Sequence, residues 1–368
     1  MTAGFSALPP RFVLAMYASD PIALPGLVDL QVNGWDGVDF NQENLTVEQL
    51  DHVSAGMASG GVTRYLPTIV TASRERLLHA LVRLGEALKA VERRDAPTGA
   101  LPIGIHLEGP YLSGELGYRG AHPAADCRDP DWEEFQAFQQ ASGDRIRLLT
   151  LAPERAGAIE FIERVRAAGV VISIGHTAAS GEIIRAAAKA GASMVTHVGN
   201  GCAATLPRHP NLLWEELAED SLVGCFIADG HHLPDATLKV MLRAKGLARS
   251  VLVSDVQGLG GKPPGRYSTP HLGEVELLPE GRAVVADQRV FLAGAVARLH
   301  ESWPVFRRVT GGDLGDWSQL ASINPLNALG LDGDATDVAL FARDGDRLIP
   351  RATRVSGRIV FKTTEQNG

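Results

Sequence analysis

The chain has 368 residues, 45% of them hydrophobic and 6% aromatic, which is enough apolar material for one large core. The formal net charge of -8, with basic residues scattered along the sequence, argues against nucleic acid or an anionic membrane surface as a partner. Three cysteines without metal-type spacing indicate reduced thiols in a cytoplasmic protein, and no apolar run is long enough to cross a bilayer.

Eight apolar segments with strand-like composition alternate with amphipathic or alanine-rich segments between residues 27 and 254. The strands are expected at 27–34, 62–70, 101–107, 145–151, 170–174, 192–196, 222–228 and 250–254. The helices between them are expected at 46–59, 74–94, 132–140, 154–168, 178–190, 212–218 and 235–244. This alternation favours a (β/α)8 barrel of the TIM type over an open, doubly wound sheet.

The pattern changes after residue 255. Residues 267–285 predict short β-structure with turns, followed by helices at 290–308 and 317–323 and by strands at 338–342 and 353–362. The first 24 residues hold one or two strand-like segments and no helix signal. We therefore expect residues 1–24 and 335–368 to form a small, reduced β-sandwich satellite domain, and residues 25–334 to form the barrel.

Polar side chains stand where several expected strands end, and these are the positions at which parallel barrels build their sites. Two of the apolar runs end in His176 and His197, a third ends in Glu108, and the eighth ends in Asp255. Two imidazoles and one carboxylate suit Zn²⁺, and also Fe²⁺, with coordination positions left open. The alternative is structural, because polar residues at strand ends also cap helices and hold loops.

Two absences favour a single metal ion. Many metal-dependent barrel hydrolases carry His-X-His on the first strand for a second metal, whereas this chain reads Gln31-Val32-Asn33 there, and amides are poor Zn²⁺ ligands. Such enzymes often use a carbamylated lysine on strand four to bridge two metals. None of the six lysines lies near that strand.

Further candidates lie in the loops that follow the strands. His122 stands in a long loop rich in glycine and could hydrogen-bond a substrate carbonyl, although a lone loop histidine is more often merely exposed. Asn200-Gly201 offers backbone N–H groups to an anion, to which Arg208 can add positive charge. His232 follows strand seven and can reach a ligand, and residues 256–264 indicate a mobile lid because the Walker spacing is missing.

At these residues the chain resembles the N-acetylglucosamine-6-phosphate deacetylase family of the amidohydrolase superfamily. The matching stretches occur in family order between residues 25 and 340. They are Pro25-Gly26-Leu27-Val28-Asp29-Leu30-Gln31-Val32-Asn33-Gly34, His106-Leu107-Glu108-Gly109-Pro110, Gly120-Ala121-His122-Pro123, Gly175-His176-Thr177, Thr196-His197, Ala228-Asp229-Gly230 with His232, Val253-Ser254-Asp255 and Leu292-Ala293-Gly294.

The resemblance implies a role for each of these candidate residues. It implies that Glu108, His176 and His197 bind one divalent metal ion, with Zn²⁺ favoured and Fe²⁺ as the alternative. It further implies that Asp255 is the catalytic acid/base, that His122 polarises the acetamide carbonyl and that His232 contacts the sugar. The amides near Asn200 and Gly201 would hold substrate, and Arg208 would reach the phosphate of a neighbouring subunit in a homodimer.

The chain departs from the family pattern outside the metal set. Family members usually read Thr-His-Leu-Phe-Asn-Ala-Met where this chain has Thr196-His197-Val198-Gly199-Asn200-Gly201-Cys202. The family serine of Leu-Ala-Gly-Ser is Ala295, and only 24 residues precede the first strand. These departures concern recognition of the phosphate and of the sugar more than the chemistry.

The expected activity is hydrolysis of the acetamide of N-acetylglucosamine 6-phosphate, which gives glucosamine 6-phosphate and acetate. Two alternatives remain open. One is an amidohydrolase that acts on a different N-acyl amino sugar or another amide, which the altered loop at 198–208 favours. The other is a sugar-phosphate-binding barrel without catalytic activity, against which the complete set of Glu108, His176, His197 and Asp255 argues.

Overall fold

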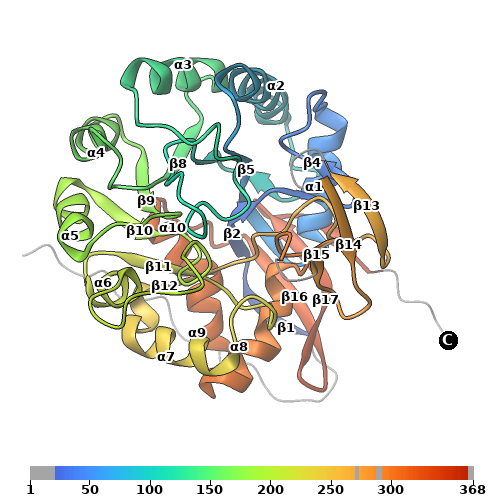
Figure 1. Ribbon diagram of the computed structural model, residues 1–368. Coiled ribbons are helices and arrows are strands. Elements are labelled where there is room, and N and C mark those ends of the chain that lie inside the picture. Colours follow the sequence, from blue (N-terminus) through green and yellow to red (C-terminus); the bar gives the residue numbers. More distant parts are fainter. Residues whose placement is uncertain (1–20, 270–272, 287–291, 364–368) are drawn as a thin grey trace, which may run out of the picture.

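The computed structural model describes residues 21–269, 273–286 and 292–363, and its centre is a barrel of eight parallel strands (Figure 1). In hydrogen-bonding order these strands are β2 (Leu27–Val32), β5 (Val62–Val70), β7 (Ile105–Glu108), β8 (Ile146–Leu151), β9 (Val171–Ile174), β10 (Ala192–Val195), β11 (Val223–Ile227) and β12 (Ser250–Val253). A parallel bridge between Val32 and Val256 brings the two ends of the row together. The predicted (β/α)8 barrel is therefore confirmed.

Helices surround this barrel in the order in which they follow the strands (Figure 1). They are α1 (Val47–Ala58), α2 (Arg74–Glu92), α3 (Trp132–Ser142), α4 (Ala158–Ala167), α5 (Gly181–Ala190), α6 (Leu212–Ala218), α7 (Asp235–Lys245) and α8 (Trp303–Thr310). Polar side chains start many of them by accepting a backbone N–H of the first turn. Thr46 and Gln49 form a reciprocal capping box, whereas Ser73, Asp131 and Ser180 each cap a helix by accepting one backbone N–H.

The strands are almost completely buried because one face packs on the helices and the other fills the barrel. Along β9, Ile172 and Ile174 belong to the large apolar cluster shared with the helices, whereas Val171 belongs to the cluster inside the barrel. This burial on both faces explains why the sequence shows continuous apolar runs rather than an alternation of apolar and polar residues. It also leaves the strand ends as the positions where polar side chains can gather.

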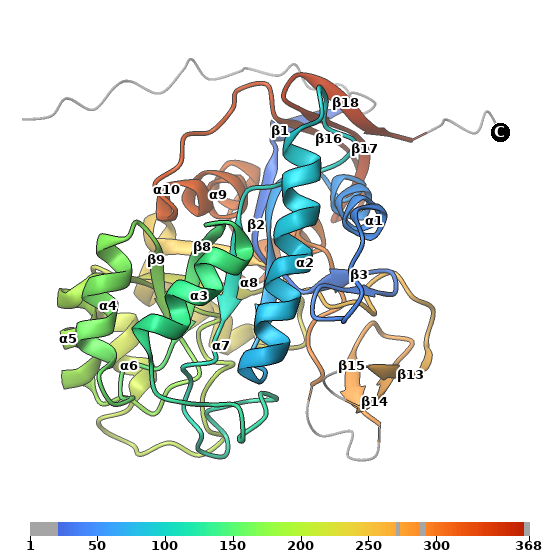
Figure 2. The ribbon, with the colours of Figure 1, turned by 90° about the horizontal axis from the view of Figure 1, so that it is seen from above.

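Two smaller antiparallel sheets flank the barrel, and a short β-ribbon, β3 (Gly34–Trp35) with β4 (Val38–Asp39), follows β2. The first sheet has the order β1 (Ile22–Pro25), β16 (Val338–Asp344), β17 (Arg347–Val355) and β18 (Arg358–Lys362). It lies next to α1 (Figure 2), where the Thr353 hydroxyl donates to the Ala58 carbonyl at 2.6 Å. The second sheet is formed by β13 (Gly265–Thr269), β14 (Gly273–Leu277) and β15 (Ala283–Val285). Strands from both ends of the chain thus share one satellite sheet, as predicted, while residues 1–20 lie outside the described residues.

Four predicted elements have clearly different bounds in the structure. The helix expected at 290–308 is wrong over 292–298, where Leu292 and Ala295 make β-bridges and Gly294 has a φ of 81°; its first two residues lie outside the described ones. Only a 3₁₀ turn, Leu299–Ser302, and α8 are helical there. The strand expected at 353–362 is split between β17 and β18 by a turn.

The other two differences are smaller. The strand expected at 101–107 consists of β6 (Leu101–Pro102), which pairs with β5, and β7. The helix expected at 317–323 begins earlier and ends later, as α9 (Leu314–Ser318), a π-helical turn (Gln319–Ile323) and α10 (Asn324–Ala328).

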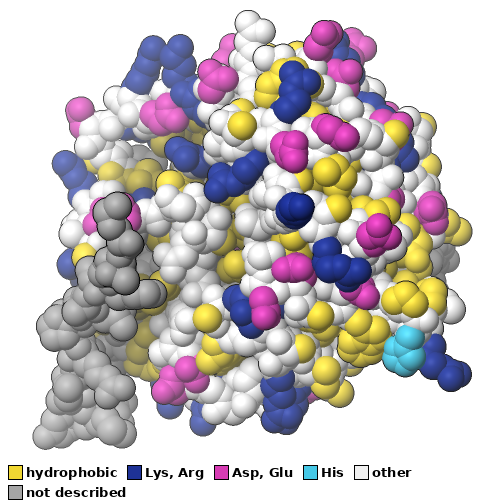
Figure 3. All heavy atoms as spheres, turned by 90° about the vertical axis from the view of Figure 1, so that its left-hand side faces the viewer, with side chains coloured by type: hydrophobic (Ala, Val, Ile, Leu, Met, Phe, Trp, Pro, Cys, Tyr) yellow, Lys and Arg dark blue, Asp and Glu magenta, His cyan; other side chains and the backbone are white. Residues whose placement is uncertain are grey.

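The outer surface carries charges of both signs. Figure 3 shows basic and acidic side chains interspersed over the face that lies on the left of Figure 1. Between α5 and α6, for example, Arg185 pairs with Glu215 at 2.5 Å. Among the described residues, no helix combines the length and the apolar character needed to span a membrane.

Candidate active site

Glu108, His176 and His197 meet at the carboxyl end of the barrel, as the sequence predicted. Glu108 Oε1 lies 3.1 Å from His176 Nε2 and 3.0 Å from His197 Nε2, and the two Nε2 atoms lie 3.2 Å apart. All three side chains are buried. The structure therefore brings together one carboxylate oxygen and two imidazole nitrogens from β7 and from the loops after β9 and β10.

The hydrogen bonds around this cluster suit a cation at its centre. His176 Nδ1 lies 3.0 Å from the carbonyl oxygen of Tyr118, so an Nδ1–H donates there and Nε2 keeps its lone pair for the cluster. Burial alone would lower the pKa of His197, but the Glu108 carboxylate outweighs burial and raises that pKa. A buried position that favours a proton between a carboxylate and two nitrogens equally favours a metal ion.

The backbone at three of the site residues is left-handed. The φ angles are 50° at His176, 28° at His197 and 52° at Asp255, values that non-glycine residues rarely adopt. In the part of the chain that the structure describes, three other non-glycine residues have a positive φ. Such conformations cluster at functional sites because they aim side chains that regular structure would point elsewhere.

The amides of the first strand hold the acidic residues of the site. Gln31 Nε2 donates to Glu108 Oε2 at 3.1 Å, and Asn33 Nδ2 donates to Asp255 Oδ1 at 2.7 Å. From the sequence alone these two amides are expected to be poor metal ligands. Here each positions a carboxylate.

Asp255 is partly buried at the end of β12, and its environment favours the protonated form. Burial raises its pKa to about 7, and the charge of Glu108 acts in the same direction. His197, His232 and the hydrogen bond from Asn33 act in the opposite direction without cancelling the shift. A carboxyl group whose pKa lies near neutrality can both take and return a proton.

The long loop after β7 brings His122 against the cluster. His122 Nε2 lies 3.2 Å from His176 Nε2 and 3.9 Å from Glu108 Oε1. Burial lowers the pKa of His122 to about 3, and neighbouring His176 adds to the effect, so its imidazole is neutral. Arg119 fixes the same loop through a 2.6 Å hydrogen bond to the carbonyl oxygen of His122.

His232 is held by Asp229 at the end of β11. Asp229 Oδ1 accepts the backbone N–H groups of His231 and His232 at 2.8 and 2.9 Å, and Oδ2 accepts from His232 Nδ1 at 2.7 Å. Burial alone would raise the pKa of Asp229, but the hydrogen bonds and charge of His232 hold it to about 2. The ionised carboxylate therefore fixes the imidazole with Nε2 as its free acceptor.

The loop after His197 contains the remaining candidates. The side-chain Nδ2 of Asn200 is buried without a partner in the described structure, as expected of a group reserved for a ligand. Gly201 packs so closely on the metal cluster that a Cβ there would lie 3.0 Å from His176 N and 3.3 Å from His197 Cε1. Arg208 is exposed, and the structure gives it no ion pair with any described carboxylate of this chain.

Comparisons with known proteins show the family of the chain. No family model matches the chain. The chain is 32% identical to N-acetylglucosamine-6-phosphate deacetylase of Bacillus subtilis over 89% of its length and 78% of that protein. The chain belongs to the N-acetylglucosamine-6-phosphate deacetylase family. It is also 31% identical to N-acetylgalactosamine-6-phosphate deacetylase of Escherichia coli O157:H7, over 84% of this chain and 78% of that protein.

The solved structures point the same way. The N-acetyl-D-glucosamine-6-phosphate deacetylase of Mycobacterium smegmatis, in complex with N-acetyl-D-glucosamine-6-phosphate, superposes with a TM-score of 0.82 at 29% identity, covering 93% of this chain and 87% of that one. Membership of this amidohydrolase family and the buried Glu/His/His set together suggest a divalent metal ion.

Beneath the site lies a chain of hydrogen bonds that the sequence did not reveal. His106 Nε2 lies 2.8 Å from the Thr150 hydroxyl, which lies 2.7 Å from Thr196 Oγ1, and Ser173 Oγ follows at 2.6 Å. Burial lowers the pKa of His106 to about 4, so the network is neutral. In the sequence these four residues are visible only as polar side chains in or beside apolar strands. Because each strand is read separately, the sequence does not show that the side chains contact one another.

Proposed function

We propose that the protein removes the acetyl group from N-acetylglucosamine 6-phosphate in amino-sugar metabolism, releasing glucosamine 6-phosphate and acetate. The observation that carries this proposal is the buried Glu108–His176–His197 set facing Asp255, in a member of a family whose relatives are named for that reaction. The donor set favours a single Zn²⁺, with Fe²⁺ as the alternative, because the first strand supplies amides rather than imidazoles.

The residues of the chain divide the work between them. A divalent cation held by Glu108, His176 and His197 would acidify a water molecule and polarise the amide carbonyl. Asp255 takes a proton from the attacking water and passes it to the departing amine, whose C–N bond breaks as the new C–O bond completes the acetate. Neutral His122 donates a hydrogen bond to the carbonyl oxygen as negative charge develops there.

The substrate contacts extend outward from the cluster. His232, fixed by Asp229, presents Nε2 to a sugar hydroxyl, and the unpartnered Nδ2 of Asn200 and the N–H of Gly201 face the same molecule. We propose that the protein is a cytoplasmic homodimer in which Arg208 binds the phosphate held by the other subunit. The exposed guanidinium, which has no carboxylate partner among the described residues, supports that role. We further propose that residues 1–24 and 335–368 form a satellite domain and that residues 25–334 form the barrel.

An acetate-release assay on N-acetyl sugars, each with and without 6-phosphate, tests the proposal. We expect turnover of the phosphorylated glucosamine derivative, and metal analysis should give one divalent ion per chain. Asp255→Asn should retain the metal and lose about 10²- to 10⁴-fold in kcat. Near-normal turnover by that variant would remove Asp255 from its assigned role.

A second substrate is favoured by one comparison. The chain is nearly as similar to a deacetylase of N-acetylgalactosamine 6-phosphate as to one of the glucosamine epimer. The loop at 199–202, where the family pattern is altered, lies directly against the metal cluster. Comparing kcat/KM on the two epimers decides between them.

A further inference from the structure

A second cavity lies beside the candidate active site, on the far side of Asp229. Its volume is about 670 Å³, within the range of small-molecule sites. The end of β11, the turn between β14 and β15, the segment at 296–304 and the start of β17 line it, and its lining includes neither the Glu/His/His set nor Asp255. The cavity therefore excludes the metal cluster and the catalytic acid/base, and it shares only Asp229 with the site proposed above.

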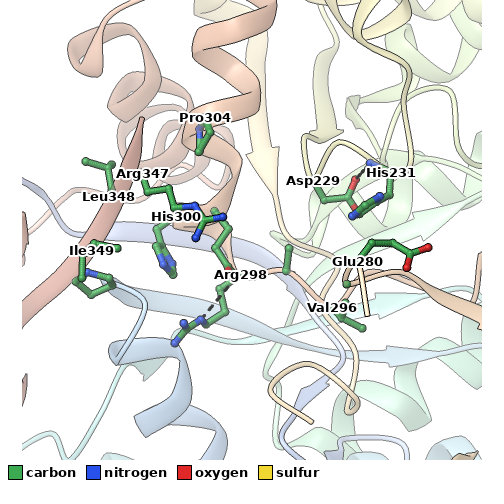
Figure 4. Close-up of a pocket in the computed structure, with 14 residues that line it drawn as sticks. Asp229, His231, Glu280, Val296, Arg298, His300, Pro304, Arg347, Leu348 and Ile349 are labelled. Atoms are coloured by element: carbon green, nitrogen blue, oxygen red, sulfur yellow. Dashed lines mark hydrogen bonds and ion pairs between the residues drawn. The ribbon is translucent and has the colours of Figure 1, made fainter. Parts of the chain in front are cut away.

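Its charged side chains are divided between two walls (Figure 4). Arg298 and Arg347 lie on one side with the neutral ring of His300, and Asp229 and Glu280 lie on the other. Glu301 also lines the cavity. Asp229 is already committed to His232, and Glu301 Oε2 accepts the backbone N–H of Arg298 at 2.6 Å. Glu280 is therefore the lining acid best placed to pair with a ligand. Its nearest described cation is Arg282, at 3.9 Å, too far for a hydrogen bond.

The basic wall is only partly neutralised by the protein. Arg347 has no ion pair with any described carboxylate, since the neighbouring Asp346 pairs with Arg307 at 2.6 Å. Arg298 donates to the Ser59 hydroxyl at 2.8 Å and lies 5.1 Å above the Trp35 ring, but its nearest carboxylate, Glu301, is 3.9 Å away.

His300 adds an unpartnered polar group to the same wall. It is only 5% exposed, yet neither of its ring nitrogens makes a hydrogen bond within the described structure, and its Nδ1 is fully buried. Nδ1 packs against Gly60, which does not line the cavity, so a ligand contact from this residue would be made through Nε2. Burial, with a smaller contribution from Arg298, lowers its pKa to about 3, so it would bind as a neutral imidazole.

We propose that this cavity binds a small zwitterion about the size of an amino-sugar phosphate. Its anionic group would lie against Arg347 and Arg298, its ammonium group against Glu280, and its carbon skeleton against Ile349 and Pro350. Charge-assisted hydrogen bonds at both ends are stronger than neutral ones. A ligand with only one charged group would pair with one wall and leave the charge of the opposite wall without a partner. The site should therefore select molecules that carry both an anionic and a cationic group.

Isothermal titration of the metal-loaded protein with glucosamine 6-phosphate tests the proposal. This choice of probe rests on the proposed function, because the probe is the expected product, whereas the cavity does not depend on it. We expect two equivalents per chain, one in the cavity and one in the active site. Glucose 6-phosphate and glucosamine, which each carry one of the two charges, should bind the cavity at least about tenfold more weakly.

Substitutions assign the second equivalent to the cavity. Arg347→Gln and Glu280→Gln should each remove it and leave kcat/KM for acetate release unchanged, while Arg351→Gln, an exposed residue on the same strand as Arg347, should bind like wild type. A single equivalent in wild type, or variants that bind like Arg351→Gln, would overturn the proposal. A parallel loss of kcat/KM would also overturn it, by making the cavity part of the substrate site. If no substrate released acetate, the proposed function would fail, but the difference in binding between wild type and Arg347→Gln would still be measurable.

Discussion

The contact between Asp229 and His232 allows a test in which one atom changes. In Asp229→Asn, the single amide oxygen is needed by the two backbone N–H groups that Oδ1 now accepts, at 2.8 and 2.9 Å. The amide nitrogen then faces His232 Nδ1 in place of Oδ2. Because that nitrogen can only donate, the imidazole must move its proton to Nε2. The atom offered to the substrate changes from an acceptor to a donor.

The size of the effect follows from the charge of Asp229. Its pKa of about 2 keeps the carboxylate ionised throughout the assay range, so the bond to His232 is charge-assisted. A hydrogen bond to a charged group contributes about 1.5–3 kcal/mol, and we expect kcat/KM to fall by roughly 10- to 150-fold. The loss should persist at every pH between 5 and 9, since the pKa of Asp229 lies far below that range.

The assay combines acetate release with ¹⁵N NMR of the histidine ring nitrogens. Wild type should show His232 protonated on Nδ1, and Asp229→Asn should show it protonated on Nε2. Asp235→Asn is the matched control, because it removes an exposed carboxylate that pairs with Arg308 at 2.7 Å and lies at the start of the following helix. An unchanged tautomer with reduced kcat/KM would refute the reasoning, and so would a changed tautomer with wild-type kcat/KM.

Three further predictions follow from other parts of the structure. Gln31→Ala removes the donor to Glu108 Oε2 and should weaken metal retention by about 10- to 100-fold in a chelator competition. Burial raises the pKa of Glu216 from 4.5 to about 8, so wild type loses folding stability as the pH rises from about 4.5 to about 8. Glu216→Gln avoids this loss and should be more stable than wild type at pH 9, by at most about 4–5 kcal/mol in urea unfolding. At pH 4.5 the two proteins should be nearly equally stable. Phe226→Ala, at a fully buried position of β11, should lower the free energy of unfolding by about 3–5 kcal/mol.

The barrel was predictable because each of its strands carries its own local signal. Apolar runs bounded by turn residues need no knowledge of their neighbours, and the capping box at Thr46 and Gln49 is visible in four consecutive residues. The segment at 292–298 was not predictable in that way. Its alanine-rich composition favours a helix, but Leu292 is bridged to Val284 and Ala295 is bridged to Val256, which comes from a distant part of the chain.

The convergence of the candidate site residues was predictable from the sequence, but the hydrogen bonds that position them were not. Strand-end position was enough to select Glu108, His176, His197 and Asp255. The hydrogen bonds from Gln31 to Glu108 and from Asn33 to Asp255 were not predicted, because the sequence shows these two amides only as poor metal ligands. Hydrogen bonds between residues separated by 77 and 222 positions depend on the closure of the barrel, which composition and periodicity do not register.

The histidines show how the barrel supports a geometry that regular strands would not produce. Ile172 and Ile174 of β9 face the helices, so strict alternation would send His176 to the same side; Val195 of β10 likewise faces the helices, which puts His197 in the same situation. The left-handed backbone at each histidine reverses this direction and turns the ring over the barrel mouth.

Such a left-handed conformation costs about 1–2 kcal/mol per non-glycine residue. Backbone hydrogen bonds immediately before and after His197, from Thr196 N to Ile174 O at 2.8 Å and from Val198 N to Cys225 O at 2.8 Å, hold the chain on both sides of the reversal. The strained residue is thus fixed by its unstrained neighbours, and the two imidazoles can converge on Glu108 although the period of the strands directs them away from it.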